Sequence, residues 1–274
     1  MSKATQAIIA VLVVAVLALG GLLVLRNRGG SEARSAEVVL YAPCGMTGPL
    51  NNAIRLFRQA HPEVPLNVVY DNAIVLVRKI RRGDRPDLFI SPGELEMRQL
   101  VEEGYVAGDS VRDFGTLDLV VFAPKRMKDL ATPQDLLGPG VKRVALADPR
   151  YNSVGYYGEQ ALRKLGLWEP LQKKLFLREY PLEAVTLVTN GDVDAGITYL
   201  TCPLDTAPEK ANKSNVRVVA KIPRDAYPPV RCQVGRLKES KQVARSQVFI
   251  DFITSEEVQK AIAIEGLLPA KEIR

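Results

Sequence analysis

The feature of this sequence that most constrains its fold is the regular alternation of two kinds of segment after residue 36. Short runs rich in Val, Ile, Leu and Tyr alternate with longer runs whose apolar residues recur at helical spacing. Strands and helices that alternate in this way form parallel sheets in which crossover helices join the strands. The sequence therefore predicts an α/β fold. The expected strands are 37–41, 66–70, 87–91, 117–123, 144–147, 195–199, 216–222 and 230–237, and the expected helices are 50–59, 75–80, 95–103, 156–165, 182–188, 241–252 and 255–265.

Residues 7–25 form an unbroken run of 19 uncharged, mostly apolar residues. A helix of that length, at about 1.5 Å per residue, spans the roughly 30 Å hydrocarbon core of a bilayer. A cleavable signal peptide is the alternative, since residues 18–20 offer a small-x-small site, but the apolar run continues past it. The position where a lipoprotein would carry its cysteine holds Gly21. We therefore expect a transmembrane signal anchor over residues 1–28 and a flexible polar linker over residues 29–36.

The charge of the chain does not indicate a nucleic-acid partner. The net charge is +6, but Lys3, Arg26 and Arg28 supply three of these charges before the first acid, Glu32. The rest of the chain carries only +3, spread over many positions of mixed sign. Proteins that bind nucleic acid usually show a denser basic patch. We expect no nucleic-acid partner.

Few residues are suited to catalysis. The only histidine, His61, precedes a proline in an expected surface turn, and the chain has no Gly-x-Ser-x-Gly, Gly-x-x-x-x-Gly-Lys or His-Glu-x-x-His motif. Asp84, Asp87, Asp192 and Asp194 are isolated acids at the boundaries of expected strands and turns, where acids commonly cap and form turns. The sequence therefore predicts a protein that is not an enzyme and that carries no cofactor.

Three cysteines, Cys44, Cys202 and Cys232, are present without any Cys-x-x-Cys pair. The spacing excludes zinc ribbons and thioredoxin-like redox motifs. In an oxidising compartment, an odd number indicates either one disulfide with a remaining thiol or three thiols that serve a ligand.

An ordered set of short motifs covers nearly the whole chain after residue 36. They are VLYA from Val39, RPDLFIS from Arg85, DP from Asp148, Gly155 with Tyr157, GLW from Gly166, NGD from Asn190, DAGI from Asp194 with Tyr199, and FIDF from Phe249. Together they resemble molybdate-type periplasmic solute-binding proteins, the type II receptors of ABC importers.

This resemblance implies a fold of two α/β lobes that close on a ligand. Lobe 1 would comprise residues 37–121 and 231–274, and lobe 2 would comprise residues 122–230. The hinge would lie around 120–122 and 230–233. The resemblance also implies a small inorganic ion as ligand, an ABC permease subunit as partner, and a body outside the cytoplasm that the N-terminal helix holds at the cell membrane.

The resemblance further implies a site, but with altered chemistry. Proteins of this type surround a dehydrated oxyanion with two serine hydroxyls, several backbone N–H groups and one tyrosine hydroxyl. Here Gly45 and Ala73 stand at the serine positions, one N–H position falls on Val154, and the next falls on Pro181, which has no N–H. Only Tyr199 keeps its role. The expected ligand-binding residues are Cys44, Gly45, Met46, Asn72, Ala73, Ser153, Val154, Tyr199 and Cys202.

Each missing donor would cost roughly 1–3 kcal/mol, so molybdate, tungstate and sulfate should bind about 10²- to 10⁴-fold more weakly than to a complete site. The same topology would place all three cysteines near the cleft. With Met46 nearby, Cys44, Cys202 and Cys232 could hold a soft metal ion such as Cu(I), or arsenite. The alternative is a Cys202–Cys232 disulfide with Cys44 as a packing residue. The expected function is therefore solute binding for an ABC importer, with a membrane-anchored thiol protein that binds or senses a soft ion as the alternative.

Overall fold

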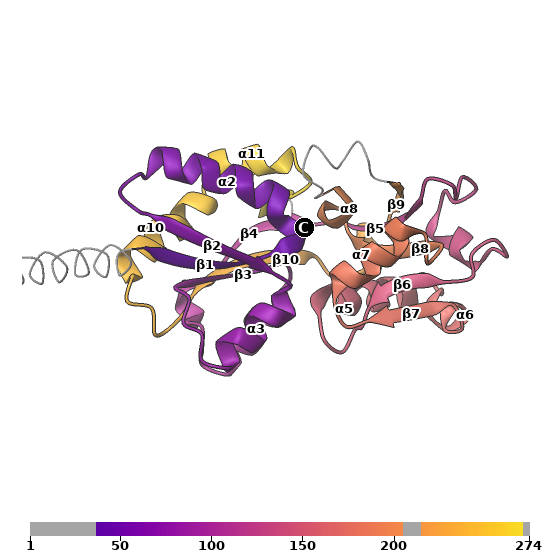
Figure 1. Cartoon of the computed structure of the whole chain (residues 1–274), viewed down its shortest axis with the longest axis horizontal. Helices are drawn as coiled ribbons and strands as arrows, with labels where there is room; N and C mark the ends of the chain where they lie inside the picture. Colours follow the sequence, from indigo (N-terminus) through magenta and orange to yellow (C-terminus); the bar gives the residue numbers. More distant parts are fainter. Residues whose placement is uncertain (1–36, 205–214, 271–274) are drawn as a thin grey trace, which may run out of the picture. The chain divides into compact units, whose positions relative to one another are not determined.

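A computed structural model describes residues 37–204 and 215–270. The expected signal anchor at 1–28 and the expected linker at 29–36 lie outside the described residues. Within the described ranges, no helix is both long enough and apolar enough to cross a membrane. The chain from Val38 onward forms one compact unit, which contains two separate five-stranded sheets (Figure 1).

The first sheet has the strand order β2-β1-β3-β10-β4. Strands β1, β2 and β3 are parallel, and β10 runs antiparallel to both of its neighbours, β3 and β4. The bounds are β1 Val38–Pro43, β2 Leu66–Asp71, β3 Leu88–Ser91, β4 Arg112–Leu117 and β10 Val230–Arg236.

The second sheet repeats this plan with the order β7-β6-β8-β5-β9. Strands β6, β7 and β8 are parallel, and β5 runs antiparallel to β8 and β9. In both sheets the antiparallel strand is the one that crosses over from the other half of the chain, so the prediction of purely parallel sheets was wrong at those strands. The bounds are β5 Leu119–Pro124, β6 Val144–Ala147, β7 Leu175–Arg178, β8 Ala195–Tyr199 and β9 Val216–Lys221.

Helices connect the parallel strands of each sheet, as the alternation predicts (Figure 1). We call the elements on the first sheet the first lobe and those on the second sheet the second lobe. The helices of the first lobe are α2 Thr47–Ala60, α3 Ala73–Arg81, α4 Glu94–Glu102, α10 Val243–Ile253 and α11 Glu256–Ala263, and those of the second lobe are α5 Ser153–Lys164, α6 Trp168–Leu171, α7 Pro181–Asn190 and α8 Thr201–Leu204. The described part of the chain also contains four short 3₁₀ helices: η1 Cys44–Met46, η2 Gly108–Ser110, η3 Pro133–Leu137 and η4 Arg224–Ala226.

Both faces of the first sheet are buried, because its strands are apolar at consecutive positions. Leu88 and Ile90 of β3 belong to the core that contains α2 and α10, whereas Phe89 between them packs with α3 and α4. This follows from the two-residue period of a strand, which sends alternate side chains to opposite faces. Phe57 of α2 makes an edge-to-face contact with Phe249 of α10, with ring centroids 5.0 Å apart.

The chain passes between the sheets at Asp118, which separates β4 from β5. The strand expected at 117–123 is therefore β5, and only Leu117 belongs to β4, a strand that the sequence did not predict. Residues 120–122 lie inside the second sheet, paired on both sides. The reverse passage is the segment between β9 and β10, which contains η4.

Hydrogen bonds to Asp118 connect the two segments of chain that pass between the sheets. Its buried carboxylate accepts hydrogen bonds from Lys221 at 2.9 Å and Arg224 at 2.7 Å, and the next residue, Leu119, donates its N–H to the hydroxyl of Tyr227 at 3.0 Å. Burial raises the pKa of Asp118, but the hydrogen bonds from Arg224 and Lys221 lower it further, so the net pKa lies below its usual value.

We expect the substitution Asp118→Asn to lower the free energy of unfolding by about 1–3 kcal/mol at neutral pH, because it weakens this cluster. The lower end of that range applies, since Lys221 and Arg224 are half exposed. A carboxyl with a depressed pKa stabilises the fold above its unfolded pKa, and that stabilisation disappears as the pH falls through the folded pKa. The difference from wild type should therefore shrink below about pH 4 in urea titrations. Asp129→Asn, at an exposed position, is the control, and a difference that persists undiminished in acid would contradict the assignment.

Candidate functional site

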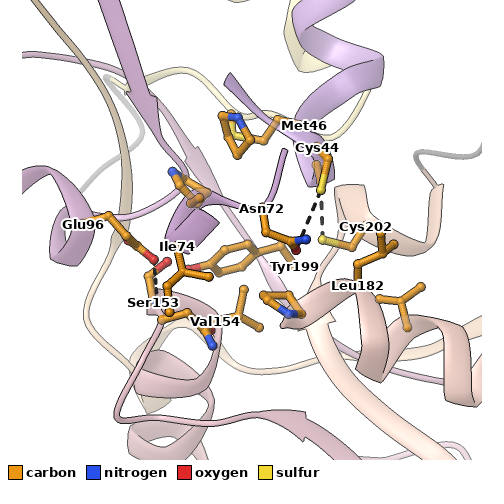
Figure 2. A pocket seen from close by; sticks show the side chains of 17 residues that line it. Cys44, Met46, Asn72, Ile74, Glu96, Ser153, Val154, Leu182, Tyr199 and Cys202 are labelled. Carbon is orange, nitrogen blue, oxygen red and sulfur yellow. Dashed lines mark hydrogen bonds between the residues drawn. The ribbon is translucent and has the colours of Figure 1, made fainter. Parts of the chain in front are cut away.

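A cavity of about 100 Å³ lies where loops of the two lobes meet (Figure 2). A buried water needs roughly 10–15 Å³ of such space, so the cavity can hold a small ion or several waters. Its lining residues are Pro43, Cys44, Gly45, Met46, Asn72, Ala73, Ile74, Pro92, Glu96, Asn152, Ser153, Val154, Pro181, Leu182, Val185, Tyr199 and Cys202. All nine residues that the sequence suggested for ligand binding are among them.

Three helices of nine or more residues begin at this cavity. α3 starts at Ala73, α5 at Ser153 and α7 at Pro181, and each helix follows a strand of its own sheet. The first N–H groups of a helix have no partner within the helix and carry partial positive charge. The wall therefore presents a set of helix N-termini, the usual protein surface for an anion, except that Pro181 contributes no N–H.

The start of α5 is fixed tightly against its preceding strand. Asn152 caps the helix, because its Oδ1 accepts the N–H of Gly155 at 3.0 Å. A Cβ atom at Gly155 would lie 2.2 Å from the carbonyl oxygen of Ala147, the last residue of β6. Only glycine fits this approach, which explains its place in the sequence motif.

Glu96 is the residue that sequence reasoning missed. Its side chain is buried, and Oε1 accepts the backbone N–H of Ser153 at 2.9 Å, across the two lobes. Oε2 is 3.4 Å from Oγ of Ser91. Burial raises the pKa of Glu96, although the hydrogen bond from Ser153 opposes the shift. The only signal in the sequence for this position was the spacing of Glu96, one helical turn before the buried Leu100. That spacing places an acidic residue on the buried face of α4.

Two hydroxyl groups reach the cavity without a hydrogen bond of normal geometry to any described residue. These are Oγ of Ser153 and the phenol oxygen of Tyr199, both buried. Figure 2 shows the Tyr199 ring lying across the cavity with its oxygen toward Ser153. Burial raises the pKa of Tyr199 well above its usual range, and the charge of Glu96 adds to the shift, so the phenol keeps its proton. Unpartnered buried hydroxyls in a cavity are available to a ligand.

The structure brings two of the three cysteines together. Cys44 belongs to the first lobe and Cys202 to the second, and Figure 2 shows their sulfur atoms pointing toward each other beside Asn72. Sγ of Cys44 lies 3.9 Å from Oδ1 of Asn72, and Sγ of Cys202 lies 4.0 Å from the carbonyl oxygen of Gly45.

Cys232 is placed elsewhere. It is a free, fully buried thiol on β10 whose Sγ lies 3.7 Å from the carbonyl oxygen of Pro92. The alternative of a Cys202–Cys232 disulfide was therefore wrong. Among the described residues, no group of three or more His, Cys, Asp or Glu side chains is arranged to hold a metal ion. The structure thus does not assemble the three-thiolate site.

A polar contact outside the cavity lining also joins the lobes. Arg78 of α3 forms an ion pair with Glu179 and donates to the hydroxyl of Tyr180 at 2.9 Å. Both partners of the ion pair are more than a third exposed, so solvent screens it and its contribution to stability is small.

The unpartnered hydroxyl of Tyr199 generates a stability prediction. We expect Tyr199→Phe to leave the free energy of unfolding unchanged or to raise it by up to about 1 kcal/mol, because it removes a buried donor that has no partner. The matched control is Tyr227→Phe, which should lose about 1–3 kcal/mol because the buried N–H of Leu119 loses its acceptor. Denaturant titrations of both variants test this. Equal losses in the two would contradict the assignment of Tyr199 as unpartnered.

Comparison with known proteins places this architecture in a family. The family model described as "Bacterial extracellular solute-binding protein" matches residues 38–268. The chain is 25% identical over 248 residues to the molybdate-binding protein ModA of Haemophilus influenzae, covering 89% of this chain and 94% of the relative. It is 27% identical to ModA of Escherichia coli, over 82% of this chain and 86% of the relative.

Solved structures share the fold. The periplasmic molybdate-binding protein of Azotobacter vinelandii superposes with a TM-score of 0.70 at 19% identity, covering 85% of this chain and 99% of that structure. The named relatives are binding proteins and not enzymes. Because the family match spans nearly all of the described body, the chain belongs to the bacterial extracellular solute-binding proteins, in the molybdate-type group that serves ABC transporters.

Proposed function

We propose that this protein captures a small inorganic ion in the cavity between its lobes and delivers it to the permease of an ABC importer. The observation that carries this proposal is the pair of unpartnered buried hydroxyls, on Ser153 and Tyr199, in an enclosed cavity walled by helix N-termini. A buried hydroxyl without a partner costs free energy in the empty protein, and a ligand that accepts from it recovers that cost.

The ligand differs from the one named for the molybdate-binding relatives. Gly45 and Ala73 line the cavity with no hydroxyl, and Pro181 has no N–H, so three donors of a complete molybdate site are missing. Much of the remaining wall is apolar, including Ile74 and Val154. We therefore expect molybdate, tungstate and sulfate to bind weakly.

Capture requires the lobes to open and close. We propose hinges at Asp118 and in the segment from residue 222 to 229, because these are the passages between the two sheets. The lobes then comprise 38–117 with 230–270, and 119–221. The strands at 120–122 and 230–233, where the sequence suggested the hinge, are held in sheet ladders. The Arg78–Glu179 ion pair would break on opening, and its exposure keeps that cost low.

We propose that residues 1–28 anchor the protein in the cell membrane with its body outside the cytoplasm. The support is the 19-residue apolar run at residues 7–25 together with membership of an extracellular binding-protein family. The protein should remain in the membrane fraction after alkaline carbonate washing. A mature N-terminus near Gly21 in fractionated cells would overturn this part of the proposal.

A second candidate is a soft-ion site formed by Cys44 and Cys202. The specific observation in its favour is that the two thiols point toward each other from opposite lobes, with Met46 in the same wall. Two thiolates suit Cu(I), which sulfur ligands select. Cys44→Ser should abolish Cu(I) binding if this candidate holds and should leave oxyanion binding intact if it does not.

The main proposal predicts that Tyr199→Phe lowers the affinity for the native solute about 10-fold, because one hydrogen bond to a charged ligand is lost. Native mass spectrometry with elemental analysis of the purified full-length protein identifies the solute, and calorimetry then measures its affinity. Small-angle scattering should show a smaller radius of gyration with solute bound. An unchanged affinity in Tyr199→Phe together with an unchanged radius would argue against a cleft receptor.

A further inference from the structure

Glu96 places a carboxylate where an anion receptor would ordinarily offer a donor. It lies in the first turn of α4, and it accepts the first N–H of α5 at 2.9 Å. The charge therefore sits between the N-termini of two helices, the position that favours an anion. The Glu96 carboxylate therefore occupies a position between two helix N-termini that a bound anion could otherwise take.

The approach of the two helices around Glu96 is close. A Cβ atom on Gly93, which precedes α4, would lie 2.8 Å from Cβ of Ser153, the first residue of α5. Glycine at this position lets the two helix N-termini meet. The carboxyl group lines the cavity as well as joining the lobes, so a ligand in the cavity faces it.

A carboxylate can only accept hydrogen bonds. Oε1 and Oε2 together offer about four acceptor sites. Ser153 N–H occupies one of them, and Ser91 Oγ lies 3.4 Å from Oε2 but also donates to the carbonyl oxygen of Gly93. A ligand atom that faces Glu96 must therefore carry a proton. A ligand oxygen without a proton would place one hydrogen-bond acceptor against another, the Glu96 carboxylate, in a buried site. The other ligand-facing groups, the helix N-termini and the hydroxyls of Ser153 and Tyr199, are donors and favour a negatively charged ligand.

Resting on the proposed function, we propose that Glu96 determines specificity for an oxyanion that carries an O–H group, such as hydrogenphosphate or hydrogenarsenate. The O–H of the anion donates to Glu96, and its remaining oxygens accept from the helix N-termini and the two hydroxyls. Molybdate and sulfate have no proton at slightly alkaline pH. They present only acceptors to Glu96, so the site disfavours them.

The test is calorimetry on the full-length protein in detergent, in slightly alkaline buffer, with sodium phosphate, arsenate, molybdate and sulfate as probes. Wild type should bind phosphate or arsenate at least about 10-fold more tightly than molybdate and sulfate. Glu96→Gln keeps the shape and can still accept from Ser153, but it removes the charge and adds an N–H donor. It should shift the affinity ratio about 10- to 100-fold toward molybdate and sulfate. Glu102→Gln, on the exposed face of the same helix, should match wild type.

A purely structural role for Glu96 gives a different result. If the carboxyl only holds the lobes together, Glu96→Gln would change the melting temperature and weaken all four probes alike, and the proposal would be overturned. A wild-type preference for molybdate would overturn it without any variant. If Glu96→Gln fails to fold, Glu96→Ala replaces it. If no probe binds wild type, this proposal fails, whereas the import function is judged separately by the solute that purifies with the protein.

Discussion

The constraint on which this molecule depends is that a parallel strand ends where its crossover helix begins. In both lobes this puts helix N-termini at one edge of a sheet, and the two edges meet at the cavity. The exposed N–H groups and their partial positive charge come from the backbone, not from any particular side chain. The fold therefore directs helix N-termini toward the cavity whichever side chains line it.

Side chains then decide what such a cavity accepts. Gly45 and Ala73 line the cavity without a side-chain donor and Pro181 without an N–H, whereas Glu96 offers an acceptor. On the proposed function these features would all disfavour a fully deprotonated dianion, because each one would leave an oxygen of that ligand without a donor or against a like charge. Tyr199 supplies a proton at every ordinary pH, since burial keeps its phenol neutral.

Much of the fold could be predicted from the sequence, because long apolar segments keep their period. The strands at 144–147 and 195–199 match in full, and the helices differ by a few residues at their ends. Other elements were missed, among them β4 and the short helices α6 and α8. A run of apolar residues from Leu117 onward does not reveal that Asp118 divides it between two sheets, since sheet membership depends on distant partners. Strand β7, with its mixed residues, has no clear period.

In the site, too, local sequence patterns could be predicted and contacts between distant segments could not. The loops could be placed from topology, so the nine suggested residues do line one cavity. Glu96 could not be placed in the site from the sequence. An acid in the first turn of a helix is already explained by its favourable interaction with the helix N-terminus. Only the contact with Ser153 of the other lobe makes Glu96 part of the cavity wall. The molybdate-binding protein of Azotobacter vinelandii shares the backbone arrangement, which is what the superposition measures. If Glu96 selects the ligand as proposed, its charge and not the backbone sets which anion can enter without leaving an acceptor unpaired.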